Sequence, residues 1–244
     1  MTEIKTSLGL VKVGSQVELF AAAAALGTAR FDPQARRSLL WALSGGATPQ
    51  AWYRWCVEQK AIPPGLAAAA RFTVSDERGV PATNPESNFG NAARQLLDPL
   101  GVPPAHRLAW PVELEPAPAV ARYTEEVFRV AGFGRAYDVC MLGLGDDVHI
   151  ASLFPGSPLL EAEDGRFFAA VNVPGKGLRL TITPSGLRAC GLIVVMVLGA
   201  GKAGAVRRLF QGTELPAAAP ARMLQSCAAR VVWLLDDAAA AGLA

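Results

Sequence analysis

The chain has 244 residues, of which 51% are hydrophobic and 18% are charged. This composition excludes an intrinsically disordered chain, and the length suits one α/β domain, which we expect to span residues 1–244. The 23 Lys and Arg residues against 21 Asp and Glu give a net charge of +2, which argues against a dedicated nucleic-acid-binding protein.

Apolar runs predict strands at residues 39–43, 71–75, 138–143, 178–182, 192–198 and 230–235. Continuous apolar runs are typical of strands buried on both faces, as in parallel sheets. Helical composition alternates with them at residues 15–29, 49–59, 87–97, 123–132 and 202–212. We therefore expect an α/β fold with a mostly parallel open sheet and helices on both faces. Pro- and Ala-rich residues 63–70, 111–120 and 215–221 are expected to form surface loops.

The N-terminal residues and the cysteines indicate in which cellular compartment the protein works. The first residues carry charges and lack the apolar segment of a signal peptide, and the most apolar run is too short to cross a bilayer. We expect a cytoplasmic protein without membrane contact. Cys56, Cys140, Cys190 and Cys227 are scattered without a CxxC spacing, and the chain has only two histidines. Buried free thiols and no metal site are the expectation.

Polar or glycine-rich segments follow four of the predicted strands, at residues 44–49, 76–81, 143–152 and 199–202. Ligands of open α/β sheets bind at the carboxyl ends of the strands. We therefore expect the four segments to converge on one rim.

The first two of these segments offer anion-binding groups. Glycines in Ser44-Gly45-Gly46 would let backbone N–H groups approach an anion at a helix N-terminus, although a simple strand-to-helix turn is an equal alternative. Arg78, after Asp76, offers a planar fork for phosphate or carboxylate, and the acid could orient it or move a proton. The alternative there is a salt-bridged strand end.

His149 lies in the sharpest segment, GLGDDVHIAS at residues 143–152. Imidazole is suited to proton transfer near neutral pH, and Asp147 could fix its tautomer. We therefore interpret His149 as a candidate general base. His106 lies in a Pro-rich connection, and we expect it to be structural or exposed.

The segment GAGKAG at residues 199–204 matches the GxGxxG pattern, but the acidic residue of a dinucleotide-binding fold is missing about 20 residues further on. A lysine at a helix start fits a phosphate contact better. Lys202 and Arg179 are therefore candidate cations for the same rim.

Taken in order, the segments resemble the 6-phosphogluconolactonase family, which is related in fold to glucosamine-6-phosphate deaminases and ribose-5-phosphate isomerases. They are LSGGATP (43–49), DERGVP (76–81) with Ser87-Asn88, YDVCMLGLGDDVHIASLFPG (137–156), LRLTIT (178–183), GAGK (199–202) and WLLDDAA near the end. Deaminases usually carry an aromatic residue after the acidic pair and a histidine loop continuing toward Phe-Asn-Glu-Pro. Arg78 and the SLFP continuation here favour the lactonase.

The resemblance implies an enzyme that hydrolyses 6-phospho-D-glucono-1,5-lactone in the pentose phosphate pathway. His149 would deprotonate the attacking water, and Asp147 would orient its ring. The cations Arg78, Arg179 and Lys202 would meet the phosphate and the developing charge, with Ser44, Gly45, Gly46 and Asp76 completing the site. The family needs no metal or organic cofactor. We expect a monomer or a weak homodimer whose partner is the small phosphorylated lactone.

One position departs from the family pattern. Val148 stands where the family usually has the glycine of Asp-Gly-His. If that glycine has a positive φ, valine would strain the loop by about 1 to 3 kcal/mol, and it could also fill the pocket. Two alternatives therefore stay open: a non-catalytic sugar-phosphate-binding protein, and a hexose-phosphate isomerase or deaminase.

Overall fold

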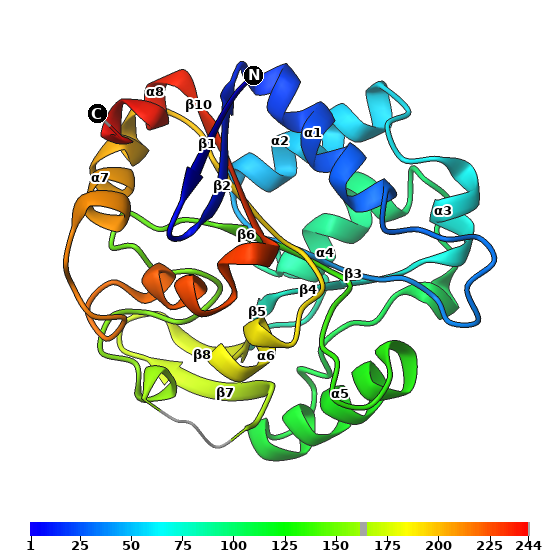
Figure 1. Ribbon diagram of the computed structural model, residues 1–244. Helices are drawn as coiled ribbons and strands as arrows, with labels where there is room; N and C mark the ends of the chain where they lie inside the picture. Colours follow the sequence, from blue (N-terminus) through cyan, green and yellow to red (C-terminus); the bar gives the residue numbers. More distant parts are fainter. Residues whose placement is uncertain (162–164, 244) are drawn as a thin grey trace.

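A seven-stranded sheet with the order β1-β2-β10-β9-β6-β3-β4 runs through the molecule (Figure 1). β1 is antiparallel to β2, and all other neighbours are parallel. The computed structural model describes residues 1–161 and 165–243. The strands are β1 (Thr2–Thr6), β2 (Gly9–Gly14), β3 (Leu40–Leu43), β4 (Arg71–Val74), β6 (Val139–Gly143), β9 (Ile193–Val197) and β10 (Val231–Asp236).

Helices cover both faces of this sheet: α1 and α2 lie on one side and α7 and α8 on the other (Figure 1). The α-helices are α1 (Gln16–Thr28), α2 (Ala47–Glu58), α3 (Pro64–Ala69), α4 (Asn88–Ala92), α5 (Pro116–Ala131), α6 (Pro184–Arg188), α7 (Ala203–Gln211) and α8 (Asp237–Ala240). Ala93–Leu97 continues α4 as a π-helix. Short 3₁₀ segments are Pro104–His106, Pro158–Leu160, Ala200–Lys202 and Ala241–Leu243, and a longer one, Pro220–Arg230, is kinked at Cys227. The predicted fold class is confirmed.

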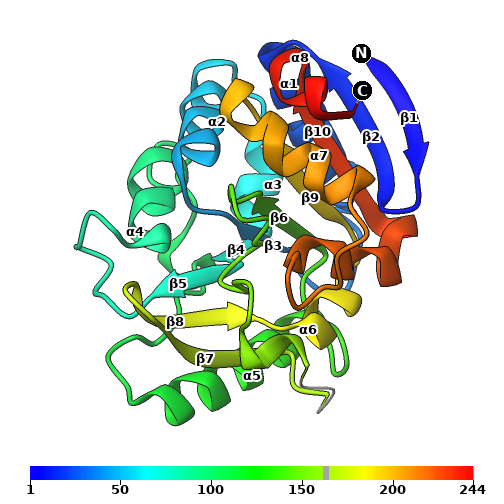
Figure 2. The same ribbon diagram turned by 90° about the vertical axis from the view of Figure 1, so that its left-hand side faces the viewer.

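A second, antiparallel sheet has the order β5-β8-β7, with β5 (Asp76–Arg78), β7 (Phe168–Val173) and β8 (Gly177–Ile182). Figure 2 shows it below the large sheet, with α5 beside β7. The predicted strand at 178–182 exists, but it belongs to this sheet, and the predicted loop at 76–81 begins with β5. Apolar periodicity identifies a strand without identifying its partner, which explains the first difference. β5 was missed because its three residues are all charged and give no apolar signal.

Two segments expected to be loops contain helices. α3 occupies most of residues 63–70, and α5 begins at Pro116, inside residues 111–120. Both helices carry a proline in their first turn, where its missing N–H is not needed and its fixed φ suits the helix. The prolines therefore mark helix starts here.

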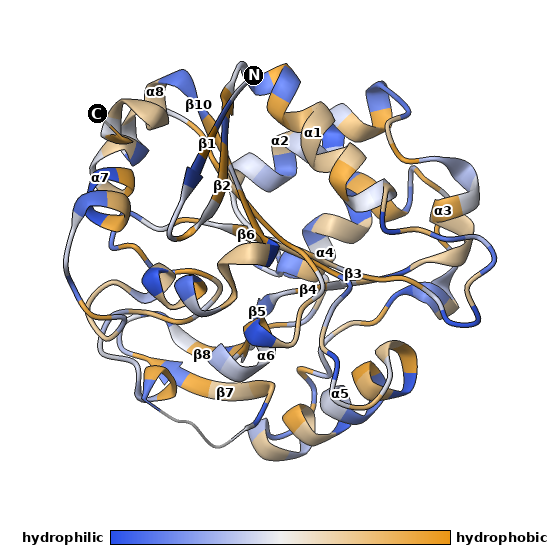
Figure 3. Ribbon diagram, in the orientation of Figure 1, coloured by the Kyte–Doolittle hydropathy of each residue, from blue (hydrophilic) through white to orange (hydrophobic). Residues whose placement is uncertain are grey.

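The large sheet forms the centre of the core. The strands β9 and β10 are predominantly hydrophobic (Figure 3), and Trp41 and Trp233 are fully buried. Helix α1 packs closely on β3, since a Cβ atom at Gly27 would lie 2.0 Å from the Trp41 ring. The four cysteines are buried thiols, as predicted. Among the described residues, no helix is both long and apolar enough to cross a membrane.

Candidate active site

A cavity of about 230 Å³ opens at the carboxyl ends of the central strands and receives residues from all four predicted rim segments. Ser44 directly follows β3, Asp76 opens β5 just after β4, Gly143 ends β6, and Lys202 follows β9. The cavity is lined by Ser44, Gly45, Gly46, Asp76, Arg78, Asn88, Gly143, Leu144, Gly145, His149, Ala151 and Lys202. A cavity of this size suits one small metabolite.

His149 lines this cavity and is hydrogen-bonded to Asp147, which the described lining does not include. The Nδ1 atom of His149 lies 2.5 Å from Oδ1 of Asp147, and the same oxygen accepts a 3.2 Å bond from the His149 backbone N–H. The His149 side chain is 28% exposed and that of Asp147 is 45% exposed. Partial burial acts to raise the pKa of Asp147, but the hydrogen bond and charge of His149 outweigh it, so the pKa is lowered. The carboxylate is therefore ionised beside the imidazole.

Val148, between the acid and the base, has a φ of 67°. This is the left-handed region, which is strongly unfavourable for a β-branched residue, so the strain anticipated from the sequence is present. The side chain is fully buried in the core, and the described residues that line the cavity do not include it. Valine therefore strains the loop without filling the pocket.

The loop is held in this conformation from several sides. The N–H of Ala221 donates to the Val148 carbonyl at 3.0 Å, and that of Gly145 donates to the His149 carbonyl at 2.9 Å. The neighbouring Ile150 and Leu153 are fully buried. Together these contacts hold the backbone of the loop in place, which allows Val148 to keep its strained conformation.

Two glycines in the cavity wall allow close approaches. A Cβ atom at Gly145 would lie 1.9 Å from Nδ1 of His149 and 2.7 Å from Oδ1 of Asp147. A Cβ atom at Gly45 would lie 1.9 Å from Oδ1 of Asn88. Any side chain at Gly145 would displace the acid-base pair, a requirement that the sequence pattern alone did not show.

The N-terminus of α2 faces the same cavity through Gly45 and Gly46. Gly46 is the N-cap residue, with a φ of 99°, and it has no side chain to cap the helix. The first backbone N–H groups of a helix carry partial positive charge and bind anions. The start of α2 is therefore chemically suited to an anion in this cavity.

Arg78 and Arg179 lie directly opposite each other in the β5-β8 pair. Arg78 lines the cavity, whereas the described lining residues do not include Arg179, which stands beside Arg78. Burial, together with the like charge of Arg78, lowers the pKa of Arg179. Two adjacent guanidinium groups favour an anionic ligand, since it would relieve their mutual repulsion.

Lys202 reaches the cavity from the end of β9, and its Nζ lies 2.7 Å from Oδ1 of the exposed Asp146. An exposed ion pair of this kind contributes little stability, so a ligand anion can compete with Asp146 for the lysine. Arg78, Lys202 and the start of α2 thus each contribute a positive group to the lining of the cavity.

Asp76 is a buried carboxylate at the cavity, held by Ser152, whose Oγ donates to it at 2.6 Å. Asn88, at the start of α4, donates from Nδ2 to the Asp76 carbonyl at 2.8 Å. The sequence places Asn88 in one of the family segments, but its pattern does not assign this residue to the site. Glu77, the residue after Asp76, has a structural role. Its carboxylate accepts hydrogen bonds from the backbone N–H groups of residues 78, 88 and 89 and from the Ser87 hydroxyl.

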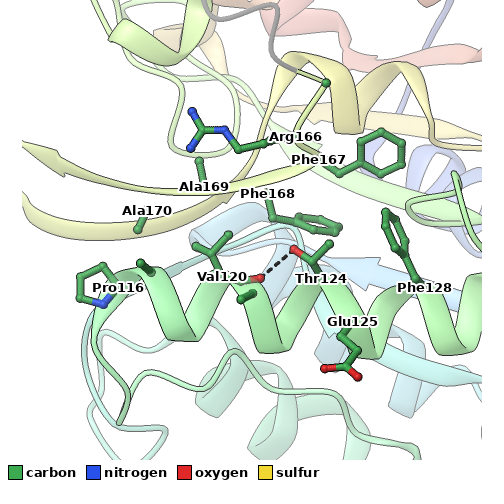
Figure 4. Close-up of a pocket in the computed structure, with 13 residues that line it drawn as sticks. Pro116, Val120, Thr124, Glu125, Phe128, Arg166, Phe167, Phe168, Ala169 and Ala170 are labelled. Atoms are coloured by element: carbon green, nitrogen blue, oxygen red, sulfur yellow. Dashed lines mark hydrogen bonds between the residues drawn. The ribbon is translucent and has the colours of Figure 1, made fainter.

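A larger cavity of about 800 Å³ lies between α5 and β7, away from this site. Figure 4 shows Val120 and Thr124 on the side of α5 that faces β7, with Glu125 pointing away. Its lining is mostly apolar and lacks an acid-base pair among the described residues, so we place the chemistry at the smaller cavity. Within the described part of the chain, no group of three or more His, Cys, Asp or Glu side chains could hold a metal ion.

Residues 15–233 match the family described as glucosamine-6-phosphate isomerases/6-phosphogluconolactonase. The human 6-phosphogluconolactonase is 32% identical over 243 residues, covering 95% of this chain and 93% of the human one. That of a Nostoc species is 34% identical over 207 residues, covering 83% of each. The solved structure of the Trypanosoma brucei 6-phosphogluconolactonase superimposes with a TM-score of 0.77 at 26% identity, covering 100% of both chains. The chain belongs to the glucosamine-6-phosphate isomerase/6-phosphogluconolactonase family.

Proposed function

We propose that the chain hydrolyses 6-phospho-D-glucono-1,5-lactone to 6-phosphogluconate, with His149 as the general base. The observation that carries this proposal is the hydrogen bond between His149 and Asp147, beside a small cavity that His149 lines together with the cations Arg78 and Lys202. The relatives at 32% and 34% identity bear the name of this activity and are matched over most of their length. Their name supports the lactone as substrate.

His149 activates water through its Nε2 atom. With Nδ1–H donating to Asp147, Nε2 is the acceptor nitrogen of the neutral ring. Nε2 takes a proton from water as the oxygen attacks the lactone carbonyl carbon. The tetrahedral intermediate collapses as the bond to the ring oxygen breaks, and the imidazolium returns its proton to that oxygen. The proton balance closes, and the neutral imidazole is regenerated.

Asp147 stabilises the cation that His149 becomes. Its lowered pKa keeps the carboxylate charged near neutral pH, where that charge can neutralise the imidazolium. The carboxylate also holds the ring by Nδ1, so Nε2 keeps one direction. Asp147 is in this account a positioning residue that also provides charge.

The cations and backbone donors at the cavity bind the phosphate and the charge that develops on the carbonyl oxygen. Arg78, with Arg179 beside it, supplies guanidinium groups, and Lys202 supplies an ammonium. The N–H groups at Gly45 and Gly46 add donors that need no reorganisation during the reaction. Asp76 can only accept hydrogen bonds when ionised, so it is suited to the hydroxyl groups of the sugar.

The non-catalytic alternative loses one of its two grounds, a filled pocket, because the Val148 side chain is buried away from the cavity. The deaminase alternative is tested by comparing the reactions of three substrates. Purified protein is given the phosphorylated lactone, unphosphorylated glucono-1,5-lactone and glucosamine 6-phosphate in parallel. We expect rapid opening of the first, much slower opening of the second and no ammonia from the third. Ammonia release without lactone opening would overturn the proposal.

A further inference from the structure

Phe154 lies against the candidate general base. The centroids of the Phe154 and His149 rings are 4.2 Å apart, and the ring planes are inclined by 32°. The turn between them is ordered by a bond from the Leu153 N–H to the Ile150 carbonyl at 3.0 Å, and Leu153 is fully buried. The main chain therefore sets the position of Phe154 relative to the imidazole.

The hydrogen bond to Asp147 by itself does not fix the imidazole. A single contact at Nδ1 allows the ring to tilt about that contact, and the χ2 torsion of histidine has a broad minimum. The Gly145 backbone limits the ring on one side, since even a Cβ atom there would be 1.9 Å from Nδ1. The Phe154 ring supplies a further surface, and tilting toward it would bring the two rings into collision.

Phe154 also borders a second cavity of about 650 Å³, which Asp147 and Lys176 line as well. The Nζ atom of Lys176 lies 5.4 Å from the centroid of the Phe154 ring. The described lining of this cavity does not include His149. Phe154 thus stands between the imidazole and a space large enough to hold several water molecules. Without the aromatic ring, that space would be available to the imidazole and to water.

We propose that Phe154 is a positioning residue: its ring holds the His149 imidazole in the orientation that directs Nε2 at the lactone carbonyl. The proposal rests on His149 being the general base. Phe154 is not expected to touch the substrate. Its loss should therefore lower kcat and leave KM nearly unchanged.

The test compares Phe154→Leu and Phe154→Tyr with Phe128→Leu, a matched control. Phe128 is also half-buried, and its ring packs against Phe133 and Phe167 beside the other cavity. We expect Phe154→Leu to lower kcat by about 10- to 100-fold while KM changes by less than about threefold. Phe154→Tyr should restore most of kcat, and Phe128→Leu should lower Tm without a specific loss of kcat.

A substrate-free measurement separates this proposal from the proposed function. The chain has two histidines, so the imidazole resonances of His149 can be assigned with His149→Ala. In ¹⁵N-histidine NMR spectra, we expect the hydrogen-bonded Nδ1 proton of His149 to be observed in the wild type and in Phe128→Leu. It should be broadened or lost in Phe154→Leu.

An unchanged Nδ1 signal in folded Phe154→Leu overturns the positioning role, whether or not the wild type opens lactones. A kcat within about twofold of the wild type does so too, as does a loss matched by Phe128→Leu. An inactive wild type with the expected NMR change would instead count against the proposed function alone.

Discussion

The Nδ1 atom of His149 lies 2.5 Å from Oδ1 of Asp147, and the residue that joins them is in the left-handed region of the backbone. Residues two apart in an extended chain point their side chains in the same direction but have no tight contact. The positive φ of Val148 tightens the turn and brings acid and base into contact. The strain at Val148 is therefore part of what assembles the pair.

Asp147→Asn should lower kcat by about 100-fold, because the amide leaves the imidazolium without a compensating charge. The pKa of Asp147 is lowered in the folded chain, so the wild-type carboxylate is ionised near neutral pH and the amide of the variant removes one charge. A kcat for Asp147→Asn within about threefold of the wild type would contradict the pairing.

Val148→Gly should leave kcat/KM within about threefold of the wild type, because the buried valine side chain does not reach the cavity. Val148→Ala is the matched control for stability, since both variants lose the buried side chain but only glycine relieves the strain. Val148→Gly should exceed Val148→Ala by about 1 kcal/mol in the free energy of unfolding, measured with urea. A rise of more than about tenfold in kcat/KM for Val148→Gly would restore the non-catalytic interpretation.

Gly145→Ala should lower kcat by about 100-fold, because the new methyl group must displace the imidazole or the Asp147 carboxylate. Gly204→Ala is the control: it lies in α7, and no heavy atom of the described structure outside its own helix lies within 4 Å of a Cβ placed there. That variant should keep wild-type kinetics. Equal kinetics for the two alanine variants would show that the loop does not hold His149 as described.

Arg78→Met should raise KM for the lactone by about 10- to 100-fold, the usual value of a charged hydrogen bond to a ligand. Binding of 6-phosphogluconate, followed by calorimetry, should weaken by a similar factor. The exposed Arg36 is the control, since the described lining of the cavity does not include it. Arg36→Met should change neither quantity, and an unchanged KM in Arg78→Met would remove Arg78 from the phosphate site.

Much of the large sheet could be predicted from the sequence, because its central strands are short apolar runs buried on both faces. The β1-β2 hairpin was missed: β1 is an exposed edge strand, and its residues TEIKT give no apolar signal. β7 was missed too, because its burial varies along the strand. The second sheet could not be inferred, since the pairing of Arg78 with Arg179 joins segments about one hundred residues apart.

The rim could be predicted because loops after parallel strands gather at one edge of the sheet. This rule predicts that Ser44, Asp76, His149 and Lys202 lie close together, and in the structure all four line one cavity. Gly145 and Phe154 escaped notice for a physical reason. Their roles depend on the space around the imidazole, and spacing along the chain does not show which backbone or ring will border that space.

The most direct test of the central claim compares wild type with His149→Ala for opening of 6-phospho-D-glucono-1,5-lactone near neutral pH. The wild type should accelerate opening well above the spontaneous rate, and His149→Ala should not exceed the spontaneous rate. Calorimetry should show 6-phosphogluconate binding to His149→Ala within about threefold of the wild type, since the cations remain. A wild type that does not accelerate opening, or a His149→Ala variant with more than about a tenth of its kcat/KM, would contradict the account.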